Sequence, residues 1–439
     1  METTPTTPSV AAAQTAPQDI VLWSGIDWAD QKHCLFTCRP DGGQRQMHWL
    51  EQKPQALDDF FLRWREKHPN GHIAVVLEQS RGALLYALLK YDFLRLFPVN
   101  PRCLADFRDA LRASGAKDDP CDAQLLAEFG CKHSEHLREL KLADPATRQL
   151  ILLNEQRRDI VDEQTALSNK LTDALKCYYP VALELFKDDM VAPIALAFLK
   201  RWPNLSAAQK AKEGVLRAFF HAQNCRSEEK IQLRLDAIKA AKPLTEDPAL
   251  IRTMQLLVET LLKRLASVQQ SIERYDERIA EVFATHSKAQ VFKSFPGAGK
   301  VLAPRLAAAF GTTEDNFPSA SAMQCWSGVA PVKKQSGKTK VVLFRWARPV
   351  FLHQTFVEYA RSSIKFSDWA RAFFQERVDR GWNKFRIYRA LAFKWIRILW
   401  RCWKNNEQYD EAKYLQSLQK RGIKTYAGLR SAPAPTPSN

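Results

Sequence analysis

The segment Ile20-Val-Leu-Trp-Ser-Gly-Ile-Asp27 decides how the first part of this chain folds. It is an apolar run that ends on a carboxylate, as expected of a buried strand that reaches the edge of a sheet. A second apolar run, Ile73–Leu77, ends in the same way on Glu78. A carboxylate at the end of an apolar strand is costly unless it pairs or binds a cation. These two runs therefore predict a buried sheet with an acidic edge.

The strand and helix signals around these runs indicate the topology of the sheet. Two strands follow Asp27, with the turn Pro40-Asp-Gly-Gly43 between them, and a helix and a short strand follow Glu78. The expected strands cover residues 20–26, 33–39, 46–50, 73–77 and 96–99, and the expected helix covers residues 82–91. A three-strand meander followed by alternating helices and strands is the order of an RNase H-like α/β fold, which we expect over residues 20–144.

A third acidic stretch, Lys117-Asp-Asp-Pro-Cys-Asp-Ala123, opens a predicted helix. Asp119 and Asp122 are three residues apart and share one helical face. Asp118 and Asp122 are four apart and also share a face, so the spacing does not choose between Asp118 and Asp119. Four carboxylates at one sheet edge would repel one another unless Mg²⁺ or Mn²⁺ neutralised them. Two such ions about 4 Å apart stabilise the attacking and leaving oxygens of phosphoryl transfer.

The positive charge of the chain is concentrated in its last third. The 439 residues carry 65 Lys and Arg against 48 Asp and Glu, a net charge of +17. Residues 291–430 alone hold 26 Lys and Arg and nine Asp and Glu, so this stretch accounts for the whole excess. It also holds seven of the twelve tryptophans. Basic and aromatic side chains together favour a nucleic-acid partner, because they can grip phosphates and stack on bases.

Other features of the composition argue against several classes of protein. No run approaches the ~18 uncharged apolar residues of a membrane-spanning helix, and the first residues lack the pattern of a signal peptide. The nine cysteines are an odd number and are scattered, which argues against a disulfide framework. We therefore expect a soluble cytoplasmic protein with no membrane partner. Its polar ends, residues 1–19 and 427–439, are expected to be disordered.

The middle of the chain, residues 145–290, is predicted to be almost wholly helical. Within residues 251–282, ten apolar residues alternate at spacings of three and four, which is a strong coiled-coil pattern. A weaker pattern covers residues 150–171, with Arg157 and Gln164 at core positions. The two segments could pair as a hairpin within the chain or between subunits. The length of the second helix favours a homodimer formed through this coiled coil.

The first motif of the basic block, residues 291–426, is Phe295-Pro-Gly-Ala-Gly-Lys300, which precedes an apolar helix. It lacks the Walker spacing and has valine after the lysine, so we exclude nucleotide hydrolysis. A hairpin whose backbone amides hold a DNA phosphate beside Lys300 fits the motif better, with tight helix packing as an equal alternative. From residue 351 onward the block is expected to be mostly helical.

The second motif surrounds Ser336 within residues 326–340, which we expect to form a loop. A serine beside glycine among lysines could attack a phosphodiester, because the cations offset charge on the pentavalent phosphate. No nearby histidine serves as a base, and taken alone such a loop more often binds phosphate without attacking it. The basic residues expected to contact nucleic acid around the serine are Lys333, Lys334, Lys338, Lys340, Arg345 and Arg348.

Taken together, these motifs resemble those of the DEDD transposases of bacterial insertion sequences, the IS-one-ten family, which includes the invertase Piv. They occur in the family's order over about residues 21–142 and 291–400. The matching motifs are Gly-Ile-Asp-Trp-Ala at residues 25–29, Glu78 on its strand, Lys-x-Asp-x-x-Asp-Ala at 117–123, Pro-Gly-Ala-Gly at 296–299 and Gly-x-Ala-Pro…Ser-Gly-Lys at 328–338.

The resemblance implies a RuvC-like domain over residues 20–144 and a helical transposase domain over residues 291–426. In such a protein a carboxylate tetrad binds Mg²⁺, and a serine, here Ser336, attacks DNA to form a covalent phosphoserine link. By motif the tetrad maps to Asp27, Glu78, Asp119 and Asp122. The resemblance also implies that dimers, joined into tetramers, recombine donor and target DNA under the guidance of an element-encoded bridge RNA, in the bacterial cytoplasm close to the nucleoid.

Two alternative functions remain open from the sequence. A hydrolytic RuvC-like junction nuclease would need the carboxylates but not Ser336, so it would form no covalent adduct with DNA. A non-catalytic nucleic-acid scaffold would need only the heptads and the basic block, and it would tolerate loss of metal and of the carboxylates. The leading expectation is the serine recombinase, because the acidic and serine motifs occur together in one chain.

Overall fold

The computed structural model describes residues 19–78, 82–111, 118–187, 189–313, 317–337, 339–346 and 348–421. The chain divides between Leu142 and Ala143 into two compact units. Apart from residue 19, the ends expected to be disordered, 1–19 and 427–439, lie outside the described residues. Within the described residues no helix is both long and apolar enough to cross a membrane.

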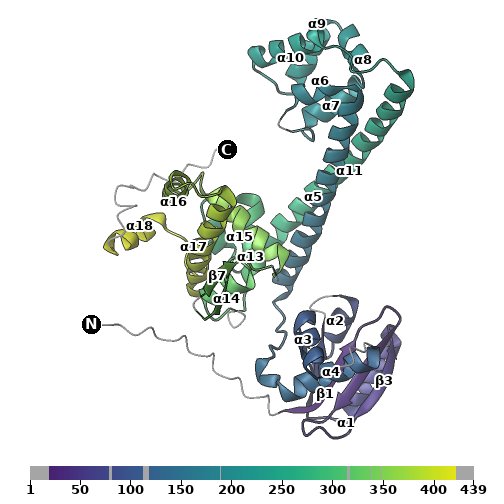
Figure 1. Ribbon diagram of the computed structural model, residues 1–439, viewed down its shortest axis with the longest axis vertical. Helices are drawn as coiled ribbons and strands as arrows, with labels where there is room; N and C mark the ends of the chain where they lie inside the picture. Colours follow the sequence, from purple (N-terminus) through teal and green to yellow (C-terminus); the bar gives the residue numbers. More distant parts are fainter. Residues whose placement is uncertain are drawn as a thin grey trace. The chain divides into compact units, whose positions relative to one another are not determined.

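The first unit is a five-stranded mixed sheet with the order β3-β2-β1-β4-β5 (Figure 1). The first three strands form an antiparallel meander, and β4 and β5 run parallel to β1. This is the strand sequence expected from the alternating signals, so the mixed α/β prediction is confirmed. The strands are β1 (Ile20–Asp27), β2 (Lys32–Cys38), β3 (Gln46–Glu51), β4 (His72–Leu77) and β5 (Leu94–Pro98).

Helices cover both faces of this sheet because its strands are apolar on both sides. One core lies between the sheet and α1 with α2, and it includes Ile26, Phe61 and Leu84. The other lies between the sheet and α4, and it includes Trp23 and Leu126. The helices are α1 (Pro54–Lys67), α2 (Ala83–Leu88), α3 (Pro101–Leu111) and α4 (Asp119–Lys132), followed by a 3-10 turn (Ser134–His136).

The second unit is built on two long antiparallel helices, α5 (Pro145–Tyr178) and α11 (Pro248–Thr285), which pack side by side. All ten heptad residues of α11 are buried or half-buried, as the pattern predicts. The polar core positions of α5 find polar partners on α11. Arg157 contacts Asp276 at 2.5 and 2.9 Å, and Gln164 contacts Gln269 at 2.8 Å. The hairpin pairing within the chain is therefore the one observed, and the homodimer remains a prediction.

A separate helical core packs against the C-terminal half of α5 and the N-terminal half of α11. It buries large side chains such as Phe198, Phe220 and Tyr179 against α5 and α11. Its five short helices are α6 (Pro180–Leu185), α7 (Pro193–Arg201), α8 (Leu205–Lys210), α9 (Glu213–Ala222) and α10 (Glu228–Ala240).

The remaining residues form a core rich in aromatic side chains at the other end of the pair. Trp369, Trp395 and Trp403 are fully buried there, whereas Trp326 and Trp346 are exposed. The elements are α12 (Ala289–Lys293), α13 (Gly299–Phe310), α14 (Ala320–Trp326), β6 (Val332–Ser336), β7 (Thr339–Leu343), α15 (Val350–Ser363), α16 (Asp368–Asp379), α17 (Lys384–Asn405) and α18 (Glu411–Lys420). The loop expected over residues 326–340 is wrong, because most of it belongs to the β6–β7 hairpin.

Candidate active site

The acidic residues of the strands lie on one face of the sheet, at one edge. Asp27 ends β1, and Glu78 directly follows β4, which is parallel to β1, so both lie at the carboxyl edge. Side chains alternate between the two faces along a strand. Trp23 packs in the core on the α4 face, so Asp27, four residues further along, projects to that face. Val76 packs in the same core, so continued alternation puts Glu78 there as well.

Two glycines let α4 approach this face closely. A Cβ atom at Gly25 would lie 2.1 Å from the carbonyl oxygen of Ala123, so only glycine fits at this point of β1. Further along α4, a Cβ atom at Gly130 would lie 2.7 Å from the Trp23 ring. These two contacts show that α4 runs antiparallel to β1. The first turn of α4 is therefore at the end of β1 that carries Asp27.

The pKa of the Cys34 thiol is influenced by the charges at this edge. Cys34 pairs with Asp27 across the β1–β2 ladder and is buried. Burial, and after it the negative charges of Asp119, Asp27 and Asp118, raise the pKa of Cys34 to about 11. Negative charge from β1 and from the start of α4 therefore acts on one buried thiol.

Asp118 and Asp119 occupy different positions at the start of α4. Asp118 is the N-cap residue, and its Oδ1 accepts a hydrogen bond from the backbone N–H of Cys121 at 2.7 Å. Asp119 is exposed in the first turn of the helix. The capping contact gives Asp118 a structural role that Asp119 does not have. Both carboxylates lie at the start of α4, so each is still a candidate ligand.

The fourth predicted carboxylate, Asp122, is paired with an arginine. Only 7% of the Asp122 side chain is exposed, and its Oδ1 accepts a hydrogen bond from Arg108 of α3 at 2.6 Å. The oxygen donors of the acidic edge suit a hard cation chemically. These carboxylates do not form a preformed metal site, because no group of three His, Cys, Asp or Glu side chains among the described residues is arranged to bind an ion. The structure thus places the four carboxylates at one edge without closing them into a cage.

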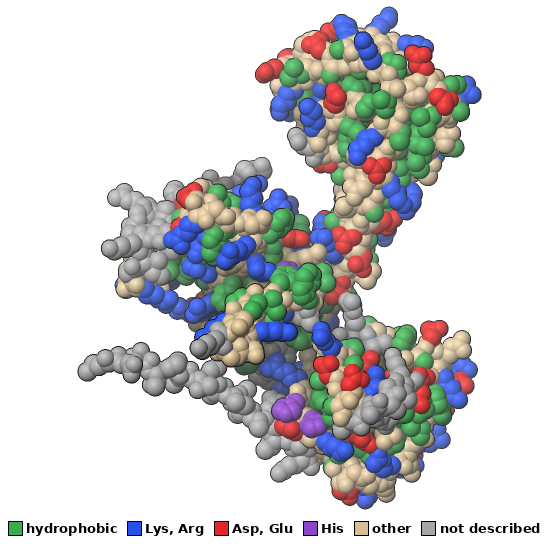
Figure 2. All heavy atoms as spheres, in the orientation of Figure 1, with side chains coloured by type: hydrophobic (Ala, Val, Ile, Leu, Met, Phe, Trp, Pro, Cys, Tyr) green, Lys and Arg blue, Asp and Glu red, His purple; other side chains and the backbone are tan. Residues whose placement is uncertain are grey.

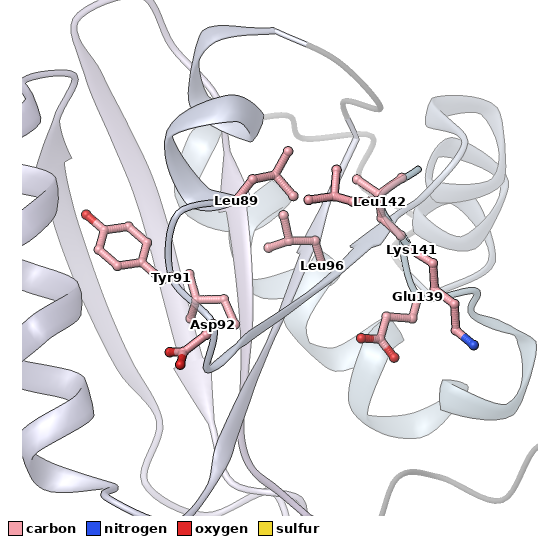
Figure 3. A pocket seen from close by; sticks show the side chains of 9 residues that line it. Leu89, Tyr91, Asp92, Leu96, Glu139, Lys141 and Leu142 are labelled. Carbon is pink, nitrogen blue, oxygen red and sulfur yellow. The ribbon is translucent and has the colours of Figure 1, made fainter. Parts of the chain in front are cut away.

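A shallow hollow in the first unit lies away from this edge (Figure 3). Leu89, Leu96 and Leu142 lie together in it, while the charged ends of Asp92 and Glu139 point away from them. Residues from the amino-terminal part of β5 line this hollow, whereas the carboxylates lie at the carboxyl edge of the parallel strands. This hollow is therefore not part of the acidic site.

The serine of the second unit lies at the tip of an exposed hairpin. Ser336 is the last residue of β6 and pairs with Thr339 of β7 across the turn. Every described residue from Lys333 to Leu343 is exposed, including Lys333, Lys334 and Lys340. Lys338 lies outside the described residues. The hairpin therefore presents a hydroxyl and several ammonium groups directly to solvent.

Aromatic and guanidinium groups pack at the base of this hairpin. The guanidinium carbons of Arg348 and Arg389 lie 4.3 and 4.9 Å from the centre of the Phe344 ring. Burial, and then the charges of Arg386 and Arg348, lower the pKa of Arg389. The predicted residues Arg345 and Arg348 also donate to backbone carbonyls here, Arg345 to Ala330 and Arg348 to Arg345 itself. They thus support the hairpin as well as adding positive charge beside it.

The glycine-rich motif forms a tight connection between α12 and α13. Gly297 has a φ of +74°, and a Cβ atom there would lie 2.9 Å from Phe366. Ser362 of α15 donates a hydrogen bond to the Gly297 carbonyl at 2.8 Å. Helix α13 begins at Gly299, and the exposed Lys300 lies in its first turn, where backbone N–H groups have no partner within the helix. The tight packing is therefore observed, and phosphate binding by the start of α13 remains a prediction.

A further basic surface was not singled out from the sequence. Helix α17 has 22 residues, of which seven are Lys or Arg and none is acidic. Four of its five exposed cations recur at intervals that place them on one side, opposite the buried residues, whereas Lys384 in the first turn does not lie on that side. Figure 2 shows Lys and Arg side chains gathered where α16 and α17 lie in Figure 1. The exposed cations of this α17 stripe are Arg386, Arg397, Arg401 and Lys404.

Comparison with known proteins defines the class of this protein. A family model described as "Transposase", of the DEDD type, matches residues 24–180. A second model, described as "Transposase IS116/IS110/IS902 family", matches residues 289–375. The first match includes the acidic edge, and the second includes the glycine-rich turn and the serine hairpin. The protein is a DNA transposase.

The similar proteins belong to the same kind of mobile element. The chain is 25% identical over 406 residues to a mini-circle transposase for IS117 from Streptomyces coelicolor, covering 90% of this chain and 96% of that protein. It is 24% identical over 397 residues to a 42 kDa protein of insertion element IS900 from Mycobacterium paratuberculosis, covering 89% and 98%. With the two family models, these matches show that the chain belongs to the IS110 (IS-one-ten) family of DEDD transposases.

Proposed function

We propose that this transposase cuts and exchanges DNA strands through a covalent bond to Ser336, with divalent metal held at the acidic edge and an element-encoded RNA as guide. The observation that carries the proposal is the exposed position of Ser336 at a lysine-bearing hairpin tip. Exposed ammonium groups on the same hairpin can offset charge on a phosphate that the hydroxyl attacks. The sheet order β3-β2-β1-β4-β5 supports a RuvC-like, RNase H-like fold for the first unit.

The first unit contributes the carboxylates that would hold metal. Asp27, Glu78, Asp119 and Asp122 lie at one edge of the sheet and offer oxygen ligands of the type that Mg²⁺ and Mn²⁺ prefer. One or two bound ions would supply charge stabilisation to phosphoryl transfer. The role of the chain itself is to hold these carboxylates in register, which the close packing of α4 on Gly25 achieves.

The second unit contributes the nucleophile and its cationic surroundings. In the proposed step the Ser336 oxygen bonds to phosphorus, and the bond between phosphorus and one deoxyribose oxygen breaks. The serine hydroxyl gives up its proton as it attacks and the leaving deoxyribose oxygen gains one, so no net proton is consumed, and the phosphoserine keeps the strand attached for a later exchange. Lys333, Lys334 and Lys340 are close enough along the hairpin to offset charge on the phosphate.

Two surfaces of the second unit support binding of the DNA backbone. The α17 stripe presents cations along one side of a straight helix, and the start of α13 presents backbone N–H groups beside Lys300. Positive charge of this kind binds phosphates without reading sequence. Target choice by base pairing with a guide RNA is consistent with this surface, and dimers that join into tetramers would bring donor and target together.

A trapping experiment tests the nucleophile. The protein, its co-purifying RNA, donor and target DNA are incubated with Mg²⁺, and denaturing gels reveal protein joined to DNA. We expect Ser336→Ala to abolish both the adduct and strand exchange while DNA binding is retained. Thr339→Ala is the matched control, because it removes an exposed hydroxyl from the paired position of the same hairpin. An adduct that persists in Ser336→Ala would exclude this serine as the nucleophile.

The same experiment separates the second candidate function. The acidic edge by itself favours a hydrolytic junction nuclease, because metal-dependent hydrolysis needs carboxylates and no serine. Such an enzyme would cut DNA in the presence of Mg²⁺ without forming an adduct, and Ser336→Ala would cut at the same rate. Asp27→Asn should abolish cutting under either function, whereas a non-catalytic scaffold would show no cutting at all.

A further inference from the structure

Arg108 forms an ion pair with one of the four carboxylates of the acidic edge. It lies in the last turn of α3, and its Nη2 donates to Asp122 Oδ1 at 2.6 Å. Both side chains are largely buried, with 14% and 7% of their surfaces exposed. A buried carboxylate needs such a partner, because an unpaired charge inside a protein is costly. Arg108 is therefore the cationic partner of Asp122 in this structure.

The pair is not fully satisfied, which is unusual for a purely structural contact. Arg108 Nε is buried and has no hydrogen-bond partner among the described residues. A guanidinium carries five N–H groups, and a well-satisfied buried arginine uses most of them. A buried donor without a partner carries an energetic cost, and in native proteins such atoms often mark a functional constraint. Arg108 is thus held at this edge at some cost to the fold.

The pair also accounts for the open arrangement of the acidic edge. Asp27 ends β1, and the contact of α4 with Gly25 brings the start of α4, which carries Asp118, Asp119 and Asp122, to the same end, so several carboxylates gather in a small region. The guanidinium of Arg108 faces one of the carboxylates directly. A divalent ion that used Asp122 would approach this guanidinium, and the two positive charges would repel. Arg108 and metal therefore compete for the same carboxylate.

We propose that Arg108 is a positioning residue that holds Asp122 in an ion pair until a divalent metal ion displaces it, so that Arg108 sets how readily the acidic edge takes up metal. The inference rests on the proposed metal-binding role of Asp122. Arginine cannot lose its proton, so a displaced Arg108 needs another anion. A DNA phosphate is the anion that the substrate brings, and the guanidinium fork matches it. Metal uptake and DNA binding thus favour each other through Arg108.

Direct measurement of Mn²⁺ binding to the full chain tests this inference without any activity assay. Without DNA, Arg108→Gln should bind Mn²⁺ about tenfold more tightly than the wild type, because the competing cation is gone. Addition of duplex DNA should tighten Mn²⁺ binding to the wild type and leave the variant unchanged. Arg102→Gln is the matched control, since it removes one positive charge from an exposed position on the same helix.

Several outcomes would overturn the inference. Equal or weaker Mn²⁺ binding by Arg108→Gln would assign Arg108 a structural or ligand-orienting role. If Arg108→Gln does not fold, the measurement on the wild type still tests the inference. A wild-type Mn²⁺ affinity that does not change when DNA is added would contradict the coupling. Arg108→Lys keeps the charge and should bind Mn²⁺ as the wild type does. If Mn²⁺ binds neither protein, the proposed metal site fails together with this inference. If Mn²⁺ binds both alike and DNA has no effect, only the inference about Arg108 fails.

Discussion

The acidic edge and the serine hairpin differ in how the protein holds them. The carboxylates lie on strands and a helix that are packed between two cores, and one of them is buried in an ion pair. Ser336 lies on two short strands whose side chains almost all face solvent. Packing therefore fixes the carboxylates, whereas only the backbone ladder and the aromatic base fix the serine. The difference teaches that the acidic edge depends on the stability of its unit, and that the hairpin can be altered without harm to the fold.

The largest expected effect is the replacement of Gly25. A valine there would place its Cβ atom 2.1 Å from the Ala123 carbonyl oxygen, so α4 would have to move away from β1. We expect Gly25→Val to destabilise the protein by about 3 kcal/mol or more and to abolish DNA cutting. Chemical denaturation followed by tryptophan fluorescence measures the loss. Gly214→Ala is the control, because the added methyl group meets no atom within 4 Å apart from its chain neighbours and the backbone of its own helix; equal effects would contradict the close packing.

The next largest effect concerns the α17 stripe. Replacement of Arg397, Arg401 and Lys404 by alanine should lower the affinity for duplex DNA by roughly tenfold or more near physiological salt. The affinity should also fall less steeply as salt is added, because about three fewer phosphate contacts are made. Fluorescence anisotropy at several salt concentrations measures both. The matched control removes three exposed cations from α11, Arg252, Lys263 and Arg274. An equal loss of DNA affinity in the control would show that the effect comes from net charge and not from the position of the α17 stripe.

A smaller effect of pH is expected from Asp144, the N-cap of α5. Burial alone would raise its pKa, but hydrogen bonds from Thr147 and Thr312 outweigh burial and lower the pKa to about 2. Because the folded value lies below the ordinary one, the stabilisation is present above pH ~4 and is lost as the pH falls toward 2. After allowance for solvent screening, we expect about 1 kcal/mol. Other carboxylates titrate in both proteins over this range, so urea denaturation at pH 6 and at pH 3 should show a larger loss of stability for the wild type than for Asp144→Asn.

The smallest expected effect is on stability at the hairpin tip. Ser336→Ala should change the free energy of unfolding by less than about 0.5 kcal/mol, since an exposed side chain with few contacts contributes little. The same urea denaturation measures it. A large loss of stability would mean that the serine holds the hairpin together, and the contrast between the two regions would then be wrong.

Much of the fold could be predicted because its signals are local. The apolar runs that end on Asp27 and Glu78 predicted the sheet, and the spacing of three and four predicted the buried face of α11. The hairpin was missed because exposed lysines interrupt the apolar alternation that marks a half-buried strand. The adjacent valines at 341 and 342 were the strand signal that the sequence offered. The residues on either side of them do not alternate clearly between apolar and polar.

The candidate site could be predicted only in part. Sequence spacing placed Asp119 and Asp122 on one helical face, but it could not show that Asp118 caps the helix or that Arg108 pairs with Asp122. Such contacts depend on how two helices pack, and no periodicity encodes them. The α17 stripe was within reach, because seven cations without an acid in 22 residues are visible in the sequence.

The polar pairs between α5 and α11 have a consequence for the dimensions of the second unit. Apolar heptads alone would tolerate a slip of seven residues, or about 10 Å along the axis. Such a slip in either direction would break both polar pairs and leave one residue of each pair opposite an apolar side chain, so the two polar pairs fix the register. The 34 residues of α5 then form a helix about 50 Å long, about the length of 15 base pairs, with one core packed on its first turns at Leu150 and the other on its second half from Leu167 onward.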